Sequence, residues 1–460
     1  MTADIADNIR QDAKKRTASP RSPTMTSVST RPFFAPALRD SAKELAASLA
    51  WSPLKTEEWK FTNFREIVET LYADAPEVSE EQVRNLVSTS SFNDAAAAEV
   101  VIANGRVVAS LSRFSAEGPL IVLPLSEAAA GEYAHLVEKH LGRVTRDKNN
   151  PFLARQTASF DDGVFILIKK SAAIETPIHL IFASIALDVA ISNYPRVLIV
   201  AQDNASGSIV ETHIGEGSYL TNVVTELIAG QDASITHYRM QQDDAAASHI
   251  ATLDATIGRA SKLVTYACCI GGKLIRNDLN VRLDGQHSTA TLNGLVMTGQ
   301  SQHVDNHTLL LHLHPDCPSY ELYKHVLDGS ASAVFKGKIF VDQIAQKTDA
   351  KQQSKALLLT NTAKINSMPA LEIYADDVKC THGSTTGPLD EGMIFYLQSR
   401  GISEDQSKRL LTYAFLADVT RRIAVAPVRE KLEALMAAQH NLPSDFRIQE
   451  LTGHDEAAVY

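Results

Sequence analysis

The pattern of apolar and polar positions divides the chain into a helical beginning, a β-rich middle and a helical end. From about Asp40 to Val137, apolar residues recur mainly at helical spacing. Between about Asp161 and Lys379, short runs rich in β-branched residues alternate with small polar turns, at intervals of about 8–12 residues. Helical spacing returns after Gly387. This order predicts a mainly β protein with helical ends, and the strand spacing is compatible with a sandwich, a barrel or a solenoid.

One segment of the helical beginning has the pattern of a β-hairpin. In residues 100–108, two β-branched runs flank Asn104 and Gly105, and Asn-Gly is the strongest short-range signal for a two-residue hairpin turn. We therefore expect an N-terminal helical domain over residues 34–150 that contains a small hairpin. Residues 1–33 are rich in Ser, Thr and Arg, and we expect a disordered tail there.

Two amphipathic helices are predicted after the β-rich middle. Ser403 and Gln406 have the spacing of a capping box that opens the first helix, and Pro427 suits the first turn of the second. Each helix gathers apolar residues on one face, and the set is Leu410, Leu411, Phe415, Val428 and Leu432. Such a face needs a surface to pack against, which is either the chain's own β-rich middle or another protein.

Composition and charge narrow the classes of partner. The chain carries 54 acidic and 44 basic residues, a formal net charge of -10, which argues against a nucleic-acid groove or an anionic membrane surface as the main partner. No apolar run reaches the roughly 18–20 residues that a membrane-spanning helix needs. Four cysteines in 460 residues do not make a disulfide framework, so we expect a reducing, cytoplasmic setting. Association with other proteins fits this composition best.

The strongest concentration of candidate chemistry lies at the end of the β-rich middle. Cys380 and His382 are two positions apart in strand-like sequence, so they project from one face, roughly 6–7 Å apart along the chain. A thiol beside an imidazole suits a thiophilic metal or an iron–sulfur cluster, and Asp376 and Asp377 lie just upstream. Two ligands are half of a tetrahedral set, which indicates a site completed elsewhere in the fold or by another chain. The alternative is that Cys380 is a thiol that only packs.

A second group of candidate metal ligands is weaker. His312 and His314 share one strand face, and Cys317 follows an expected turn at Pro315. Their spacing matches no strong zinc motif, and we favour the interpretation that they are structural, hydrogen-bonded or packed residues. The lysines of residues 336–355 are expected on a solvated face. A phosphate loop of the form G-x-x-x-x-G-K-[ST] is absent from the sequence, so we expect this chain to bind no nucleotide.

Several ordered blocks carry a family resemblance, and they are Ala375–Gly383, Ile394–Ile402, Glu57–Thr62, Ser319–Lys324, Val334–Val341 and Gln346–Gln352. Together they closely resemble the SufB/SufD family of iron–sulfur cluster assembly proteins, over roughly Phe34 to Met436. The block that begins at Glu57 resembles SufD members rather than SufB members. The cysteine-rich CxxC-type motif of many SufB proteins is absent from this sequence.

The resemblance implies a fold and a domain order. Members of the family have a right-handed parallel β-helix core between helical N- and C-terminal domains. In this chain the core then corresponds to residues 151–387, and the C-terminal helical domain, where the family docks the ATPase SufC, to residues 388–460. The lack of a strict repeated motif would reflect an irregular solenoid.

The resemblance also implies a role and partners. A SufD-like chain is a non-catalytic scaffold subunit that joins a SufB-like subunit and a SufC-like ATPase. A homodimer of this chain is an alternative assembly when the SufB-like partner is absent. By resemblance, His382 lies at the contact with SufB and works with a SufB cysteine in forming the nascent cluster, and Cys380 is the second candidate. The implied cofactor is a transient iron–sulfur cluster, or iron, at a subunit interface. Helping iron to enter at that contact is part of the implied role.

Two other classes stay open from the residues alone. A stand-alone β-helix enzyme acting on polysaccharide would use Asp with Lys or Arg side chains on one solenoid face for acid–base work. The thiol of Cys380 and the imidazole of His382 are not the Asp with Lys or Arg pair that this acid–base chemistry would use. A purely structural β-solenoid module would tolerate replacement of Cys380 and His382 without consequence.

Overall fold

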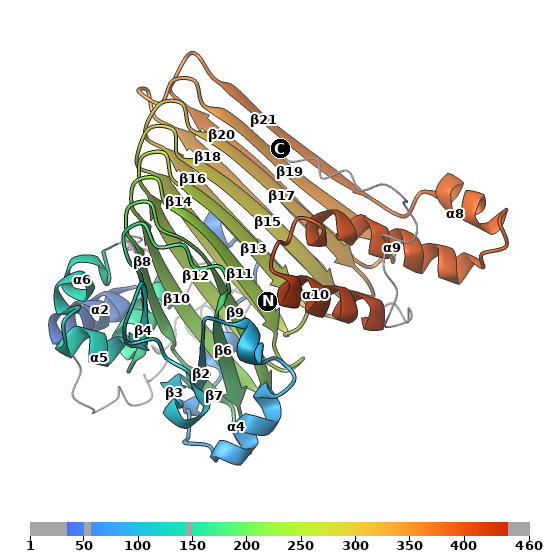
Figure 1. Cartoon of the computed structure of the whole chain (residues 1–460). Helices are drawn as coiled ribbons and strands as arrows, with labels where there is room; N and C mark the ends of the chain where they lie inside the picture. Colours follow the sequence, from blue (N-terminus) through green and yellow to red (C-terminus); the bar gives the residue numbers. More distant parts are fainter. Residues whose placement is uncertain (1–34, 50–56, 144–149, 440–460) are drawn as a thin grey trace, which may run out of the picture.

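The computed structural model describes residues 35–49, 57–143 and 150–439. In these residues the chain is mostly β, a parallel β-solenoid of about 8 turns with helices at both ends (Figure 1). The predicted fold class, a mainly β protein with a parallel β-helix and helical ends, is confirmed. The tail expected at residues 1–33 lies outside the described residues.

Successive strands of the solenoid alternate between two sheets, so each sheet receives every second strand. Within each sheet, neighbours from β5 and β6 onward pair in parallel and in register. The first sheet consists of β4 (Leu120–Pro124), β5 (Gly163–Ile168), β8 (Arg196–Ala201), β10 (Tyr219–Ala229), β12 (Ser248–Ile257), β14 (Leu274–Leu283), β16 (His303–His312), β18 (Ser332–Val341) and β20 (Lys364–Ile373), with β7 (Ile191–Asn193) and β1 (Ala73–Asp74) beside them. The second consists of β3 (Arg106–Val107), β2 (Ala98–Ala103), β6 (Ile178–Ile185), β9 (Ser206–Glu216), β11 (Ser234–Gln242), β13 (Lys262–Cys269), β15 (Thr289–Thr298), β17 (Pro318–Leu327), β19 (Asp349–Leu358) and β21 (Lys379–Gly387).

The main hydrophobic core lies between the two sheets. Alternate residues of each strand face inward, and the in-register pairing stacks them on successive turns. Ile235, Leu263 and Ala290 form one such column in the second sheet, and all three are fully buried. The column continues through Ala350 to Cys380 in the last turn. Because the strands pair in register, an inward-facing residue on one turn lies above an inward-facing residue of the preceding turn.

The N-terminal region combines helices with the first strands of both sheets. Its helices are α2 (Pro36–Ser48), α3 (Arg65–Glu69), α4 (Glu80–Val87), α5 (Leu125–Ala130), α6 (Ala134–His140) and α7 (Pro151–Ser159), with 3-10 turns at Glu57–Trp59, Asn93–Ala95 and Ala109–Leu111. The hairpin predicted at Asn104 and Gly105 forms between β2 and β3, and both residues have positive φ, 48° and 79°, as a type I′ turn requires. It is not an isolated hairpin, because β2 also pairs in parallel with β6. β4 pairs antiparallel with β5, so the N-terminal region closes the first turn of the solenoid.

The block that begins at Glu57 holds this region against the outer face of the first sheet. The guanidinium of Arg276 lies 4.4 Å from the centre of the Trp59 ring. The hydroxyl of Thr62 donates to Asp305 Oδ2 at 2.5 Å, and the same carboxylate accepts from Arg276 at 2.7 Å. The block therefore fixes the N-terminal region to β14 and β16, which lie more than 200 residues later in the sequence.

The C-terminal region consists of three helices, α8 (Glu391–Gln398), α9 (Glu404–Thr420) and α10 (Ala426–Gln439). The predicted capping box between Ser403 and Gln406 is present at the start of α9. α9 and α10 pack across the outer face of the second sheet, whereas α8 stands away from the body (Figure 1). Among the helices of the described residues, none is both long enough and apolar enough to cross a membrane.

Candidate functional site

The C-terminal end of the solenoid is open. β20 and β21 are the last strands of their sheets, and within the described residues no further strand pairs with either outer edge. Most residues of β21 are exposed, in contrast to the buried strands earlier in the same sheet. A long exposed edge offers unpaired backbone N–H and C=O groups to another strand. This end of the molecule therefore presents an exposed strand edge on β21.

Cys380 and His382 lie on β21 at this open end, and both face the space between the sheets. Cys380 is in register with Ala350, and His382 with Gln352; Ala350 and Gln352 are buried inward-facing residues of β19. Cys380 is half-buried against the main core, while His382 is exposed. Both therefore sit at the mouth of the solenoid interior. Burial raises the pKa of the Cys380 thiol, so it must release a proton when it binds a metal ion.

The two carboxylates upstream do not join this pair. Asp377 forms an ion pair with Lys347 at the turn that precedes β21, and Asp376 is exposed there. Across the described residues, no grouping of three or more His, Cys, Asp and Glu side chains could hold a metal ion. The structure thus brings together two of the four expected groups, Cys380 and His382.

A buried polar column lies beneath His382, and the sequence reasoning missed it. In-register pairing stacks Glu321, Gln352 and His382 on three successive turns of the second sheet. Gln352 Nε2 donates to Glu321 Oε2 at 2.6 Å, and burial raises the pKa of the Glu321 carboxyl to about 7. The signal was available, because Glu321 shares a strand face with the inward residues Ser319 and Tyr323, but it requires knowing which face is the interior.

The weaker group of candidate metal ligands is dispersed. His312 is fully buried and its Nε2 contacts Ser319 Oγ at 3.0 Å. Cys317 is fully buried and contacts the carbonyl oxygen of Gly285 at 3.3 Å. His314 lies on the turn between them, 3.6 Å from a carboxylate oxygen of Asp284. Each residue has its own partner, and the three do not converge.

The residues proposed for partner binding are largely covered by the chain itself. Val428 and Leu432 of α10 are fully buried in a cluster with sheet residues such as Tyr266. Leu410, Leu411 and Phe415 are half-buried on α9. The ammonium of Lys324, on the sheet, lies 4.6 Å from the centre of the Phe415 ring. The sequence pattern left open whether these helices pack on the chain's own β-rich middle or on another protein. For α10, the apolar face packs on the chain's own β-rich middle.

The exposed apolar surface of the C-terminal region is instead on α8. Met393, Phe395 and Tyr396 are 50%, 71% and 51% exposed. No residue of α8 is buried. Because α8 stands apart from the solenoid, this apolar surface is available to another protein.

A charged cluster fills part of the solenoid interior farther from the open end. Glu211 accepts from Arg239 at 2.8 Å and lies 3.1 Å from His237. Arg239 and His237 hold the pKa of the buried Glu211 carboxyl well below its usual range, although burial acts in the opposite direction. These groups neutralise one another, and the arrangement is a structural ion cluster.

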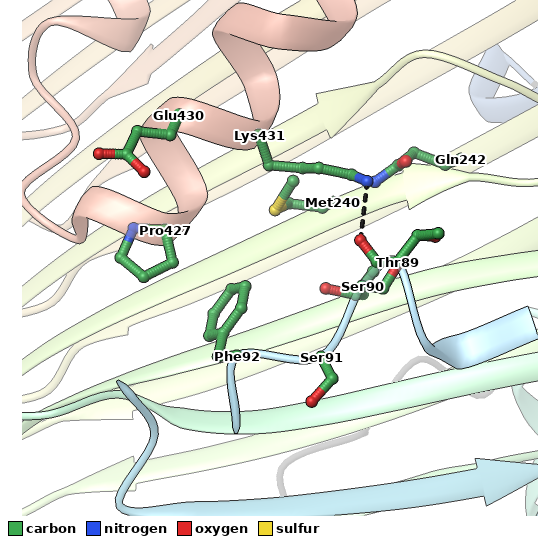
Figure 2. Close-up of a pocket in the computed structure, with 10 residues that line it drawn as sticks. Thr89, Ser90, Ser91, Phe92, Met240, Gln242, Pro427, Glu430 and Lys431 are labelled. Carbon is green, nitrogen blue, oxygen red and sulfur yellow. Dashed lines mark hydrogen bonds between the residues drawn. The ribbon is translucent and has the colours of Figure 1, made fainter. Parts of the chain in front are cut away.

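A hollow of about 300 Å³ lies on the outer face of the second sheet, between the loop after α4 and the start of α10 (Figure 2). Lys431 donates to the carbonyl oxygen of Thr89 at 3.0 Å across it. Phe92 stacks on the buried His179 with a centroid distance of 3.9 Å. Its charged side chains, Glu430 and Lys431, lie on α10 at its rim. This hollow marks where the N-terminal loop is tied to α10, and the open end is the better candidate for function.

The fold and this pair of side chains define a class: a parallel β-solenoid protein with a thiol and an imidazole at its open end. The family described as "SUF system FeS cluster assembly, SufBD core domain" matches residues 185–415, and the SufBD protein N-terminal region matches residues 28–180. The chain belongs to the SufB/SufD family of iron–sulfur cluster assembly proteins. Between the alternatives left open by the residues, family membership favours iron–sulfur cluster assembly.

Individual relatives agree with this assignment. The chain is 29% identical over 413 residues to an iron–sulfur cluster assembly SufBD family protein of Synechocystis, covering 87% of this chain and 90% of that protein. It is 32% identical over 297 residues to a SufBD family protein of Mycobacterium leprae, covering 63% and 74%. It is 26% identical over 394 residues to the iron–sulfur cluster assembly protein SufD of Escherichia coli, covering 83% and 87%.

Proposed function

We propose that this chain is the SufD-type, non-catalytic scaffold subunit of a SufBCD-type complex, and that iron enters the nascent cluster at its contact with a SufB-like subunit. The observation that carries the proposal is the open end of the solenoid, where Cys380 and His382 reach the mouth of the interior beside an unpaired strand edge. Iron and sulfide are substrates of this assembly rather than resident cofactors. We place the complex in the cytoplasm.

The unpaired edges explain how a partner of the same fold would attach. A second solenoid could add its own last strands to β20 and β21 and continue both sheets through backbone hydrogen bonds. The partner would then present its side chains directly to His382. Without that partner, two copies of this chain could pair through the same edges as a homodimer.

The chemistry of the mouth suits iron transfer better than stable iron storage. One imidazole and one thiol fill two of the four positions of a tetrahedral iron site, and a cysteine of the partner would supply a third. A site split between subunits assembles and opens with the interface, so a cluster formed there can be released. The purely structural alternative predicts instead that His382 can be replaced without loss of cluster.

The ATPase is proposed to dock on the C-terminal helices, with α8 as the main contact. Phe395, Met393 and Tyr396 supply exposed apolar surface, whereas Val428 and Leu432 are already buried against the chain's own sheet. ATP hydrolysis is assigned to that SufC-like partner.

Co-purification with cluster quantification tests the proposal. The tagged wild-type chain and its His382→Ala variant are purified with SufB- and SufC-like partners, and iron and sulfide are measured on each complex under anaerobic conditions. We expect both chains to retain the partners and the variant to carry far less cluster. His314→Ala is the matched control, because it removes an imidazole on a turn outside the open end. Loss of both partners from the wild-type chain would refute the subunit assignment, and equal cluster in both complexes would refute the role of His382.

A further inference from the structure

Gln352 lies directly beneath His382, on the preceding turn of the solenoid. The two residues are in-register partners in the parallel pairing of β19 with β21. Neighbouring strands lie about 4.8 Å apart, and in-register side chains project from the same face. The end of an inward-facing Gln352 is therefore within reach of the imidazole of His382.

Within the described part of the chain, the side-chain amide of Gln352 forms a hydrogen bond through its nitrogen but not through its oxygen. Its side chain is 1% exposed, and its Nε2 donates to Glu321 Oε2 at 2.6 Å. Its Oε1 is buried and has no hydrogen-bond partner among the residues that the structure describes. A buried carbonyl oxygen without a donor costs free energy, so a donor is expected to be supplied to it.

The opposite sheet leaves room for this amide. Gly337 of β18 faces Gln352 across the interior, and a Cβ atom at position 337 would lie only 2.1 Å from Gln352 Nε2. The glycine and the carboxylate of Glu321 together fix where the amide nitrogen lies. The remaining oxygen, Oε1, is buried without a partner among the described residues, on the turn directly beneath His382.

We propose that Gln352 is a positioning residue for His382: its Oε1 accepts the imidazole N–H, directly or through one water molecule, and so selects one tautomer. The other ring nitrogen is then left unprotonated, as a metal ligand must be, and is aimed out of the mouth. The purpose of this arrangement rests on the proposed function, whereas the hydrogen bond itself does not. Glu321 acts on His382 only through Gln352.

Nitrogen NMR of the imidazole tests this directly. The whole chain is labelled with ¹⁵N-histidine, the His382 signals are assigned by their loss in His382→Ala, and the tautomer ratio is read from the two ring-nitrogen shifts at pH 8. At this pH the Glu321 carboxyl, whose pKa is raised to about 7, is largely ionised and accepts from Gln352. We expect one tautomer to dominate in the wild-type chain. In Gln352→Met, which keeps the volume but loses the acceptor, the ratio should change about fivefold, the size of one hydrogen bond.

Two further variants separate positioning from a general loss of structure. Ser354→Ala changes a buried inward residue of the same strand that lies beneath Ser384 rather than His382, and it should leave the tautomer ratio unchanged. Gly337→Ala removes no polar group but displaces the Gln352 amide, and it should shift the ratio in the same direction as Gln352→Met. An unchanged ratio in Gln352→Met would overturn the proposal, whatever Gly337→Ala shows.

Cluster quantification on the same variants keeps the two proposals distinguishable. If the tautomer follows Gln352 but His382→Ala complexes carry normal amounts of cluster, the positioning holds and the function proposed for His382 fails. If His382→Ala loses cluster while Gln352→Met leaves the tautomer unchanged, the function holds and the positioning fails.

Discussion

The ring of Tyr323 occupies the space that Gly294 leaves empty on the preceding turn of the solenoid. The two residues are in-register partners of β15 and β17, and Tyr323 is 1% exposed. A Cβ atom at position 294 would lie 2.0 Å from Cδ1 of the ring. Gly294 is therefore required by packing, because an aromatic ring on the next turn fills its place.

Replacement of Gly294 by alanine is expected to destabilise the fold. Because Tyr323 is buried and cannot swing into solvent, the added methyl group should cost about 1–3 kcal/mol through overpacking. The measurement is the urea midpoint of unfolding. Gly299→Ala is the matched control, since nothing lies within 4 Å of a Cβ atom there. Equal midpoints for the two variants would contradict the described packing.

The two kinds of apolar residue in the C-terminal helices should behave differently when replaced. Leu432 is fully buried, so Leu432→Ala should lower the free energy of unfolding by about 2–5 kcal/mol. Phe395 is 71% exposed, so Phe395→Ala should leave the unfolding midpoint near that of the wild type while weakening retention of the ATPase partner. Unfolding curves and co-purification measure the two effects. Normal ATPase retention by Phe395→Ala would remove α8 from the proposed docking surface.

Asp254 gives a pH dependence that is independent of the open end. Burial, with the nearby Glu226 charge adding to it, raises the pKa of the Asp254 carboxyl to about 7, well above its usual range. The folded state therefore holds a proton that the unfolded state releases, and the resulting stability is present below about pH 4 and lost as pH rises toward 7. Asp254→Asn should be more stable than the wild type at pH 8, by on the order of 3 kcal/mol, and this gain should shrink toward pH 4.

Urea unfolding at pH 4, 6 and 8 checks this prediction. Asp188→Asn changes an exposed carboxylate and serves as the control. A stability gain for Asp254→Asn that is the same at every pH would show that the carboxyl does not titrate in this window.

Local features were predictable from the sequence because their causes are local. The hairpin at Asn104 and Gly105 follows from the backbone that this pair favours, and the start of α9 follows from the capping residues Ser403 and Gln406. The common face of Cys380 and His382 follows from strand alternation. The parallel solenoid itself follows only from the family resemblance, since the strand spacing is compatible with other β folds.

Contacts between distant segments were not predictable in the same way. Lys336 was expected on a solvated face, but it is 8% exposed and its ammonium lies 2.9 Å from Glu58 near the start of the chain. The column of Glu321 and Gln352 beneath His382 depends on the register between turns, which the loop lengths set. Such register is a property of the folded solenoid, and no window of the sequence carries it.

The exposure of the four cysteines leads to a last prediction, about thiol reactivity. Cys268, Cys269 and Cys317 are buried, and burial raises the pKa of each thiol, whereas Cys380 is only half-buried. An alkylating reagent should therefore modify one thiol in the native chain, at Cys380, and all four in urea. Because the pKa of Cys380 is also raised, its rate should increase about tenfold per pH unit from pH 7 to 9. Mass spectrometry of labelled peptides measures both, with Cys380→Ser as the control that should abolish native labelling.

A SufB-like partner that covers the open end should protect Cys380 from the same reagent. Unchanged labelling of Cys380 in the complex would place the subunit contact elsewhere.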